Sequence, residues 1–281
     1  MTKTAPAATA PRDPKTRNGA AHPRASQLPQ IEISGVSKTF GTGAEAVHAF
    51  GPVDMNIMPG EFVSLLGPSG CGKSTLMLMI AGLLDPTEGR IALAGREVHG
   101  PQTDIGIMFQ DNTLVPWRTV RGNIELQLEL RSLPPRDFRE RIDELLTSVD
   151  LMAFADRHPY ELSGGMQQRA AFCQAMVHDP HLMLLDEPLG KLDAMTRERI
   201  RDDLQALWQR QKPTVVFVTH SIEEAVQLST KVAVVTPRPG RIERLIPIDL
   251  PYPRDLSVKN TPEFTGYVRE IQEIFRGYGV L

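Results

Sequence analysis

The sequence predicts an α/β fold built on a mainly parallel sheet. Three mainly apolar runs, at residues 61–67, 182–186 and 214–219, have the length and composition of buried strands. Each run is followed by a segment with the periodicity of a helix. Because buried strands that alternate with helices are joined by helical crossovers, their order along the chain indicates parallel strands.

Shorter elements surround these strands. Residues 31–34 and 53–58 alternate apolar and polar side chains, as half-buried strands do, and predict an antiparallel β part near the N-terminus. A turn at Pro59 and Gly60 separates the second run from the strand at 61–67. The helix expected at 73–84 is apolar nearly all round, so it should be buried. Further strands are expected at 90–95, 105–110 and 231–236.

A charged, helical block interrupts the strand pattern between residues 120 and 150. Its apolar side chains recur at helical spacing on one face: Phe138, Ile142, Leu145 and Leu146. We interpret residues 111–178, approximately, as a helical subdomain inserted into a sheet domain that spans 30–246. Residues 247–281 then form a C-terminal extension with a helix.

Two helix starts carry capping signals. Ser221 with Glu224 three residues later forms a plausible capping box, and Thr261 precedes Pro262 at a first helical position. The helix that starts at Pro262 has one apolar face. Packing of that face on its own domain is favoured over a partner site.

Composition excludes several classes of protein. The chain has 281 residues, 41% of them hydrophobic, and a net charge of −3, which gives no bulk basic character for nucleic-acid binding. Its two cysteines make no disulfide scaffold, and a reducing compartment fits. The most apolar run, residues 75–84, is too short to cross a bilayer. Residues 1–29, rich in Ala, Pro and charge, predict a disordered tail without a secretory signal.

A phosphate-binding loop lies between the strand at 61–67 and the helix that follows. The segment "GPSGCGKST" matches the pattern G-x-x-x-x-G-K-[ST] in the required strand–loop–helix setting. Its glycines let successive backbone N–H groups face a phosphate, Lys73 supplies a charge, and the Ser74 hydroxyl can bind Mg²⁺. Cys71 is expected to face the nucleotide. The predicted nucleotide-binding residues here are Gly67, Pro68, Ser69, Gly70, Cys71, Gly72, Lys73, Ser74 and Thr75.

Polar side chains follow the other predicted strands. Asp186 ends the strand at 182–186, where a carboxylate can help to hold Mg²⁺, and Glu187 can polarise an attacking water. Taken alone, such a pair would usually be solvated, and its significance comes from the phosphate loop. His220 and Gln110 also follow strands, so they could reach a γ-phosphate or Mg²⁺.

A second segment also suits an anion. "LSGGMQQR" places Ser163, Gly164 and Gly165 directly before a predicted helix, and so offers bare N–H groups. Spacing alone does not say whose phosphate this segment would touch.

Together these motifs resemble, in order and spacing, the ATP-binding subunits of ABC transporters, over about residues 30–250. The resemblance implies a P-loop NTPase (RecA-like) core, ATP and Mg²⁺ as cofactors, and Phe40 stacking on adenine. In isolation Phe40 would more often be a core residue. The resemblance also implies two subunits that meet head to tail, with Ser163, Gly164 and Gly165 of one capping the nucleotide of the other. Asp193 would then contact the partner.

Two further segments resemble importer ATPases of the nitrate, sulfonate and taurine type: "FQDNTLVPWRTVRGNI" and "RPGRIERLIPIDLPYPRD". That resemblance implies a peripheral protein on the cytoplasmic face of a bacterial inner membrane. It would act with permease subunits and, indirectly, with an extracytoplasmic solute-binding protein. Leu114, Val115 and Trp117 would form an apolar surface for the permease, although Trp117 could instead be core.

Two residues depart from the pattern of this subfamily. Lys191 stands where alanine is usual in the subfamily, near the presumed dimer contact, and Gln174 stands where arginine is common. An exporter ATPase or a soluble, non-transport ABC ATPase uses the same motifs. The two importer-like segments favour the importer over both.

Overall fold

The computed structural model describes residues 28–111, 113–190 and 192–280. The predicted disordered tail therefore lies almost wholly outside the described residues. Within the described chain the strands are β1 Ile31–Phe40, β2 Val47–Ile57, β3 Phe62–Leu66, β4 Glu88–Leu93, β5 Arg96–Glu97, β6 Gly106–Met108, β7 Leu182–Asp186, β8 Thr214–Thr219, β9 Lys231–Val235 and β10 Ile242–Pro247. The α-helices are α1 Lys73–Ile80, α2 Val120–Glu129, α3 Arg139–Ser148, α4 Gly164–Met176, α5 Ala194–Gln211, α6 Ile222–Leu228 and α7 Pro262–Gly277.

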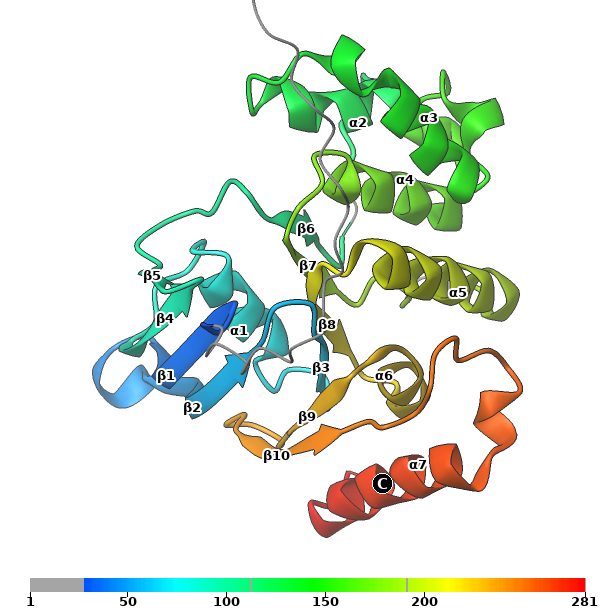
Figure 1. Cartoon of the computed structure of the whole chain (residues 1–281). Coiled ribbons are helices and arrows are strands. Elements are labelled where there is room, and N and C mark those ends of the chain that lie inside the picture. Colours follow the sequence, from blue (N-terminus) through cyan, green and yellow to red (C-terminus); the bar gives the residue numbers. More distant parts are fainter. Residues whose placement is uncertain (1–27, 112, 191, 281) are drawn as a thin grey trace, which may run out of the picture.

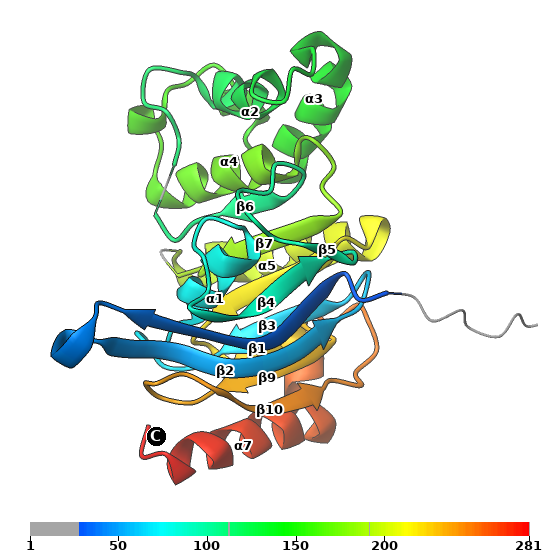
Figure 2. The ribbon, with the colours of Figure 1, turned by 90° about the vertical axis from the view of Figure 1, so that its left-hand side faces the viewer.

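Two sheets form the body of the molecule (Figures 1 and 2). The larger has the order β10-β9-β3-β8-β7-β6, and its pairs are parallel except for the antiparallel pair of β9 and β10. The smaller, β2-β1-β4-β5, is antiparallel. The predicted α/β fold with a mainly parallel sheet and an antiparallel N-terminal part is confirmed. β10 was not predicted, because its exposed Glu243 and Arg244 obscure the strand pattern.

Helix α1 lies between the two sheets and joins them into one core. Leu76 and Met77 of α1 pack in the same buried cluster as Ile33 of β1 and Leu65 of β3. The helix ends at Ile80, earlier than expected, because Gly82 has a φ of 69° and its position leaves no room for a side chain. This core fixes the loop that enters α1.

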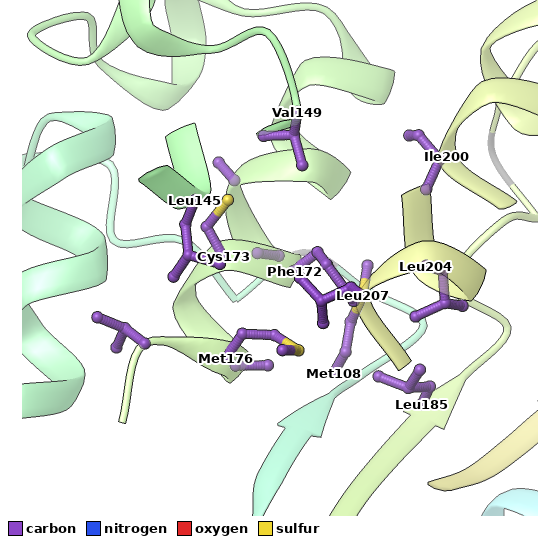
Figure 3. Close-up of a cluster of buried hydrophobic side chains, with 14 of the residues drawn as sticks. Met108, Leu145, Val149, Phe172, Cys173, Met176, Leu185, Ile200, Leu204 and Leu207 are labelled. Carbon is purple, nitrogen blue, oxygen red and sulfur yellow. The ribbon is translucent and has the colours of Figure 1, made fainter. Parts of the chain in front are cut away.

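Helices α2, α3 and α4 lie together at one end of the molecule, away from the smaller sheet (Figure 1). A second buried cluster connects this helical part to the larger sheet. Figure 3 shows Phe172 and Met176 of α4 beside Met108 of β6, Leu185 of β7 and Leu204 of α5. Because α4 is packed on the sheet in this way, the position of its N-terminus relative to the sheet is set by core packing.

The C-terminal helix α7 packs on its own domain, as expected. Thr261 caps it by accepting a hydrogen bond from Phe264 N, and Phe264, Ile271 and Phe275 are buried against α6, β9 and β10. The other predicted cap is only half formed. Ser221 accepts from Glu224 N, but the Glu224 carboxylate accepts from the Thr219 hydroxyl instead of from Ser221 N.

No helix among the described residues is long and apolar enough to cross a bilayer.

Candidate nucleotide-hydrolysing site

The phosphate loop joins β3 to α1 as the sequence predicts. β3 is fully buried, and α1 begins at Lys73. Gly70 and Gly72 have φ angles of 78° and 97°, which side chains other than glycine rarely adopt. A Cβ on Gly72 would also lie 2.8 Å from the ring of Phe50. Glycine at these positions therefore lets the backbone curl tightly at the start of the helix.

Lys73 is nearly enclosed by this loop. Its side chain is buried, and Nζ donates to the carbonyl oxygens of Gly67 and Pro68 at 2.9 and 2.8 Å. The loop thus holds the ammonium group in a fixed place beside its own N–H groups. The neighbouring Ser74 hydroxyl donates to Asp186 Oδ1 at 3.0 Å, which connects the loop to the end of β7.

The expectation that the Cys71 side chain faces the nucleotide is wrong. Cys71 is 1% exposed and packs in the cluster between the two sheets. Its sulfur lies 3.7 Å from Lys73 Nζ, beneath the loop, and burial raises the pKa of the thiol. Because the thiol is buried and Cys71 does not line the cavity, only its backbone is left to meet a phosphate.

Two carboxylates end strand β7 in different environments. Asp186 is buried, and this burial raises the pKa of its carboxyl group. Glu187 follows with a φ of 44°, an uncommon value for a residue with a side chain. Its N–H donates to Val218 O of the adjacent strand at 3.0 Å. This hydrogen bond to β8 helps to hold the backbone of Glu187 in its uncommon conformation.

Gln110 and His220 both contact the Glu187 carboxylate. Gln110 Nε2 donates to Glu187 Oε2 at 3.2 Å, and His220 Nδ1 lies 3.4 Å from the same oxygen. Gln110 follows β6 and His220 follows β8, so the residues after three strands meet at one edge of the sheet. The structure brings together these three predicted residues.

An open cavity of about 370 Å³ joins this edge to the phosphate loop. Phe40, 43% exposed, lies at its border, which agrees with a stacking surface and not with a core position. Sequence reasoning missed Ala49 and Arg238. The cavity is lined by Phe40, Ala49, Ser69, Gly70, Gly72, Lys73, Ser74, Thr75, Gln110, Glu187 and Arg238.

A larger cleft, of about 810 Å³, lies between α3 and α5. Most of its lining residues are polar or charged, Glu144 and Arg210 among them. It contains no residue of the predicted motifs, so the smaller cavity is the candidate site.

The second segment that was predicted to bind an anion does not line this cavity in the described chain. Ser163 caps α4 by accepting from Met166 N at 3.3 Å, and Ser163 and Gly164 are exposed. None of Ser163, Gly164 and Gly165 lines the cavity of its own chain. The free N–H groups at the start of α4 are therefore open to a ligand from outside.

Asp193 has a local role that sequence reasoning missed. Its carboxylate caps α5 by accepting from Met195 N and Thr196 N, both at 3.1 Å. The hydrogen bond from the Thr196 side chain, and after it those from the backbone N–H groups, lower the pKa of the Asp193 carboxyl group. The pattern of an acidic residue before a long helix could have indicated this cap. Lys191 lies outside the described residues.

The predicted permease surface is only partly exposed. Trp117 is 78% exposed, so the alternative that it is a core residue is wrong. Leu114, by contrast, is buried in the helical part.

The loop that carries Trp117 is fixed by Asn123, which is fully buried. The Asn123 amide group accepts from Val115 N at 2.6 Å and donates to the carbonyls of Val115, Arg118 and Thr119. Gln174, from α4, donates in turn to Asn123 O at 3.2 Å.

Comparison with known proteins agrees with this geometry. Residues 50–190 match the family model described as ABC transporter. The chain is 45% identical to the aliphatic sulfonates import ATP-binding protein SsuB of Bacillus licheniformis, covering 77% of this chain and 84% of that protein. It is 43% identical to the taurine import ATP-binding protein TauB of Jannaschia sp., covering 86% and 92%.

Solved structures share the fold. A dimeric, post-hydrolysis ATP-binding cassette bound to ADP and phosphate superposes with a TM-score of 0.71 at 34% identity, covering 78% of this chain and 98% of that one. The chain therefore belongs to the ABC transporter family, as one of its ATP-binding, ATP-hydrolysing subunits.

Proposed function

We propose that this subunit powers a bacterial importer of a small solute such as a sulfonate, taurine or nitrate. One observation carries the proposal. A single cavity joins an exposed aromatic side chain, a phosphate loop and the Glu187 carboxylate, in a chain whose similar relatives include import ATP-binding proteins named for sulfonates and taurine. ATP would lie with its base on Phe40 and its phosphates along residues 67–75.

The residues at the cavity also fit Mg²⁺. The Ser74 hydroxyl and Asp186 Oδ1 are 3.0 Å apart, and Gln110 offers an amide oxygen nearby, all hard ligands of the kind this ion prefers. No group of three or more His, Cys, Asp or Glu side chains suited to a metal occurs in residues 28–111, 113–190 and 192–280. An ion held by the Ser74 hydroxyl and Asp186 would take further oxygen ligands from nucleotide phosphates. When bound, Mg²⁺ would neutralise charge on those phosphates.

Hydrolysis would then depend on the group around Glu187. We assign Glu187 as the base that takes a proton from the attacking water, which bonds to the γ-phosphorus as the bond to the bridging oxygen of ADP breaks. Gln110 and His220 hold the Glu187 carboxylate, at 3.2 and 3.4 Å, and His220 would stabilise the γ-phosphate. Lys73, fixed by two carbonyl oxygens, would stay beside the β- and γ-phosphates throughout.

The segment with Ser163, Gly164 and Gly165 would complete the site of a second copy of this chain. Its exposed N–H groups at the start of α4 do not reach the cavity of their own chain, which supports capping between two head-to-tail subunits. Asp193, beyond its role as a cap, would contact the partner. Two ATP molecules would then hold the homodimer together.

The exposed loop around Trp117 would receive the permease. Asn123 pins the loop on both sides of Trp117, so the indole is presented to the surface without support from the core. An exposed Trp on a rigid loop suits a partner with an apolar helix. Through the permease, the subunit would work peripherally at the cytoplasmic face of the inner membrane, with an extracytoplasmic solute-binding protein as an indirect partner and no nucleic acid.

The test is reconstitution of the complete transporter. The tagged full chain would be purified from its own cells with its permease and placed in proteoliposomes with the co-purified solute-binding protein. ATP hydrolysis should rise when taurine, an alkanesulfonate or nitrate is added outside, and the solute should accumulate inside. An intact complex whose hydrolysis none of these anions stimulates would contradict the importer assignment for this class of solute.

A further inference from the structure

The turn between β9 and β10 brings to the cavity a side chain that is not among the predicted site residues. Thr236 N donates to Arg241 O at 2.9 Å. The Thr236 hydroxyl accepts from Arg241 N at 3.0 Å and donates to Pro239 O at 3.2 Å. The turn at residues 236–241 is therefore closed by its own hydrogen bonds and has a defined shape.

This turn is also docked against strand β2 and the phosphate loop. Gly240 O accepts from Gly51 N at 2.8 Å, and Gly240 pairs with Phe50 as an isolated bridge. A Cβ on Gly240 would lie 1.8 Å from Cys71 O, so the backbone of the turn touches the backbone of the phosphate loop. Only glycine permits this approach. Any side chain on the turn that faces the cavity is thus positioned relative to the loop.

Arg238 is that side chain. It is exposed and lines the cavity with Phe40, Gly72 and Thr75. Neither a hydrogen bond nor an ion pair ties its guanidinium group to a residue in the described part of the chain, whereas the other cation of the cavity, Lys73, already donates to two carbonyls. Arg238 therefore brings unpaired positive charge to a pocket that receives a polyanion.

We propose that Arg238 is a nucleotide-binding residue whose guanidinium group contacts the phosphate chain of bound ATP. The proposal rests on the assignment of the phosphate loop as the ATP site. A guanidinium fork matches phosphate oxygens, and its charge-assisted hydrogen bonds are stronger than those of a neutral donor. The rigid turn reduces the entropy lost when the contact forms.

The test compares two arginines of one turn. Arg238→Gln and Arg241→Gln each remove one positive charge, but Arg241 does not line the cavity. Calorimetry on the full chain would measure dissociation constants for MgATP, MgADP and adenosine. Arg238→Gln should weaken MgATP and MgADP about tenfold, the size of one charge-assisted hydrogen bond at a partly exposed site, and leave adenosine unchanged. Arg241→Gln should match the wild type for all three.

Two further measurements separate this contact from other effects. The loss in Arg238→Gln should shrink as NaCl is raised, since salt screens exposed charges, and Arg238→Lys should recover part of the affinity. Thermal unfolding without nucleotide should be the same for both glutamine variants. A Lys73→Ala chain, measured alongside, reports loss of the whole phosphate site and so tests the underlying assignment separately.

Either of two results would overturn the proposal. One is MgATP binding by Arg238→Gln that equals binding by Arg241→Gln. The other is an equal loss for adenosine and MgATP, because Arg238 would then contact the base or ribose, for instance by stacking on adenine.

Discussion

Glu187 and His220 are in contact: Oε2 of the carboxylate lies 3.4 Å from Nδ1 of the imidazole ring. Gln110 donates to the same oxygen at 3.2 Å, and the φ of 44° at Glu187 turns the side chain toward both. A carboxylate held from two sides, in an uncommon backbone conformation, is positioned before a substrate arrives. Variants of Glu187 should therefore change the hydrolysis rate more than the affinity for ATP.

Replacing Lys73 should remove nucleotide binding. Lys73→Ala deletes the ammonium group that the loop holds at Gly67 and Pro68, and most affinity for MgATP with nearly all turnover should be lost. Calorimetry measures the binding. Lys259→Ala, which removes a lysine paired with Glu198, is the control and should bind normally. Near-normal MgATP binding by Lys73→Ala would contradict the assignment of the loop.

Asp186 should make Mg²⁺-dependent binding sensitive to acid. Because burial raises the pKa of Asp186, its carboxyl group takes up a proton at a higher pH than an ordinary Asp does. MgATP affinity should fall as the pH is lowered through this raised pKa. The affinity of Asp186→Asn for ATP should lack this pH dependence. It should also be the same in the presence of Mg²⁺ as in the presence of EDTA. Calorimetry across pH would contradict the prediction if the variant followed the wild-type profile.

The same pKa shift has the opposite consequence for stability. A carboxyl group whose pKa is raised on folding stabilises the fold below its unfolded pKa, and that contribution is lost as the pH rises through the folded value. At neutral pH, without nucleotide, Asp186→Asn should therefore be at least as stable as the wild type in urea unfolding. Lower stability of the variant at neutral pH would contradict this prediction. It would mean that the hydrogen bond from Ser74 compensates the ionised carboxylate for its burial.

Trp117 should matter for transport and not for folding. Since its side chain is 78% exposed, Trp117→Ala should leave the free energy of unfolding and the hydrolysis of the isolated subunit unchanged, while it weakens assembly with the permease. Leu130, 70% exposed after α2, provides the matched control. A similar loss of assembly in Leu130→Ala and Trp117→Ala would argue against a specific permease contact.

Arg254 should be a major contributor to stability. Its guanidinium group is 1% exposed and donates to carbonyl oxygens of Val226, Ser229, Ile248 and Leu250 at 2.8–3.2 Å, so it joins the end of α6 to the segment after β10. Arg254→Ala would leave these oxygens buried without a donor and should cost about 3–5 kcal/mol in the free energy of unfolding. Arg244→Ala, which removes an exposed pair with Glu270, should cost less than about 1 kcal/mol. Equal unfolding midpoints in urea for the two variants would contradict this role.

The sequence predicted those parts of the site that depend on backbone geometry. A loop of glycines between a buried strand and a helix, and polar residues at strand ends, follow local rules. These rules are enough to predict a set of site residues that the structure then places at one edge of the larger sheet: Lys73, Ser74, Asp186, Glu187, Gln110 and His220. Local rules do not predict which of Leu114 and Trp117 is buried and which is exposed. Both are large and apolar and only three positions apart, and the hydrogen bonds of Asn123 help to hold the loop that carries Trp117 at the surface.

Residues whose role depends on contacts distant in sequence were missed for the same reason. Arg254 belongs to a segment that was interpreted as an importer feature, yet its partners lie on α6 and on the chain after β10. The Cys71 thiol turned into the core because Gly67 and β9 leave it space there, a contact that no local pattern encodes. Arg238 reaches the cavity because its turn, which precedes the unpredicted strand β10, lies beside β2 at Gly240.

The state of Glu187→Gln in the presence of ATP tests the central claim most directly. The variant keeps Lys73, Ser74 and the loop N–H groups but lacks the base, so ATP should bind while hydrolysis slows by roughly 10²–10⁴-fold. Unhydrolysed ATP, capped by Ser163 and Gly165 of a second copy, should hold two chains together. Size-exclusion chromatography should then show a dimer with ATP, a monomer with ADP, and no dimer once Ser163→Arg is added. A Glu187→Gln chain that remains monomeric at saturating ATP, with and without its permease, would contradict capping between two subunits.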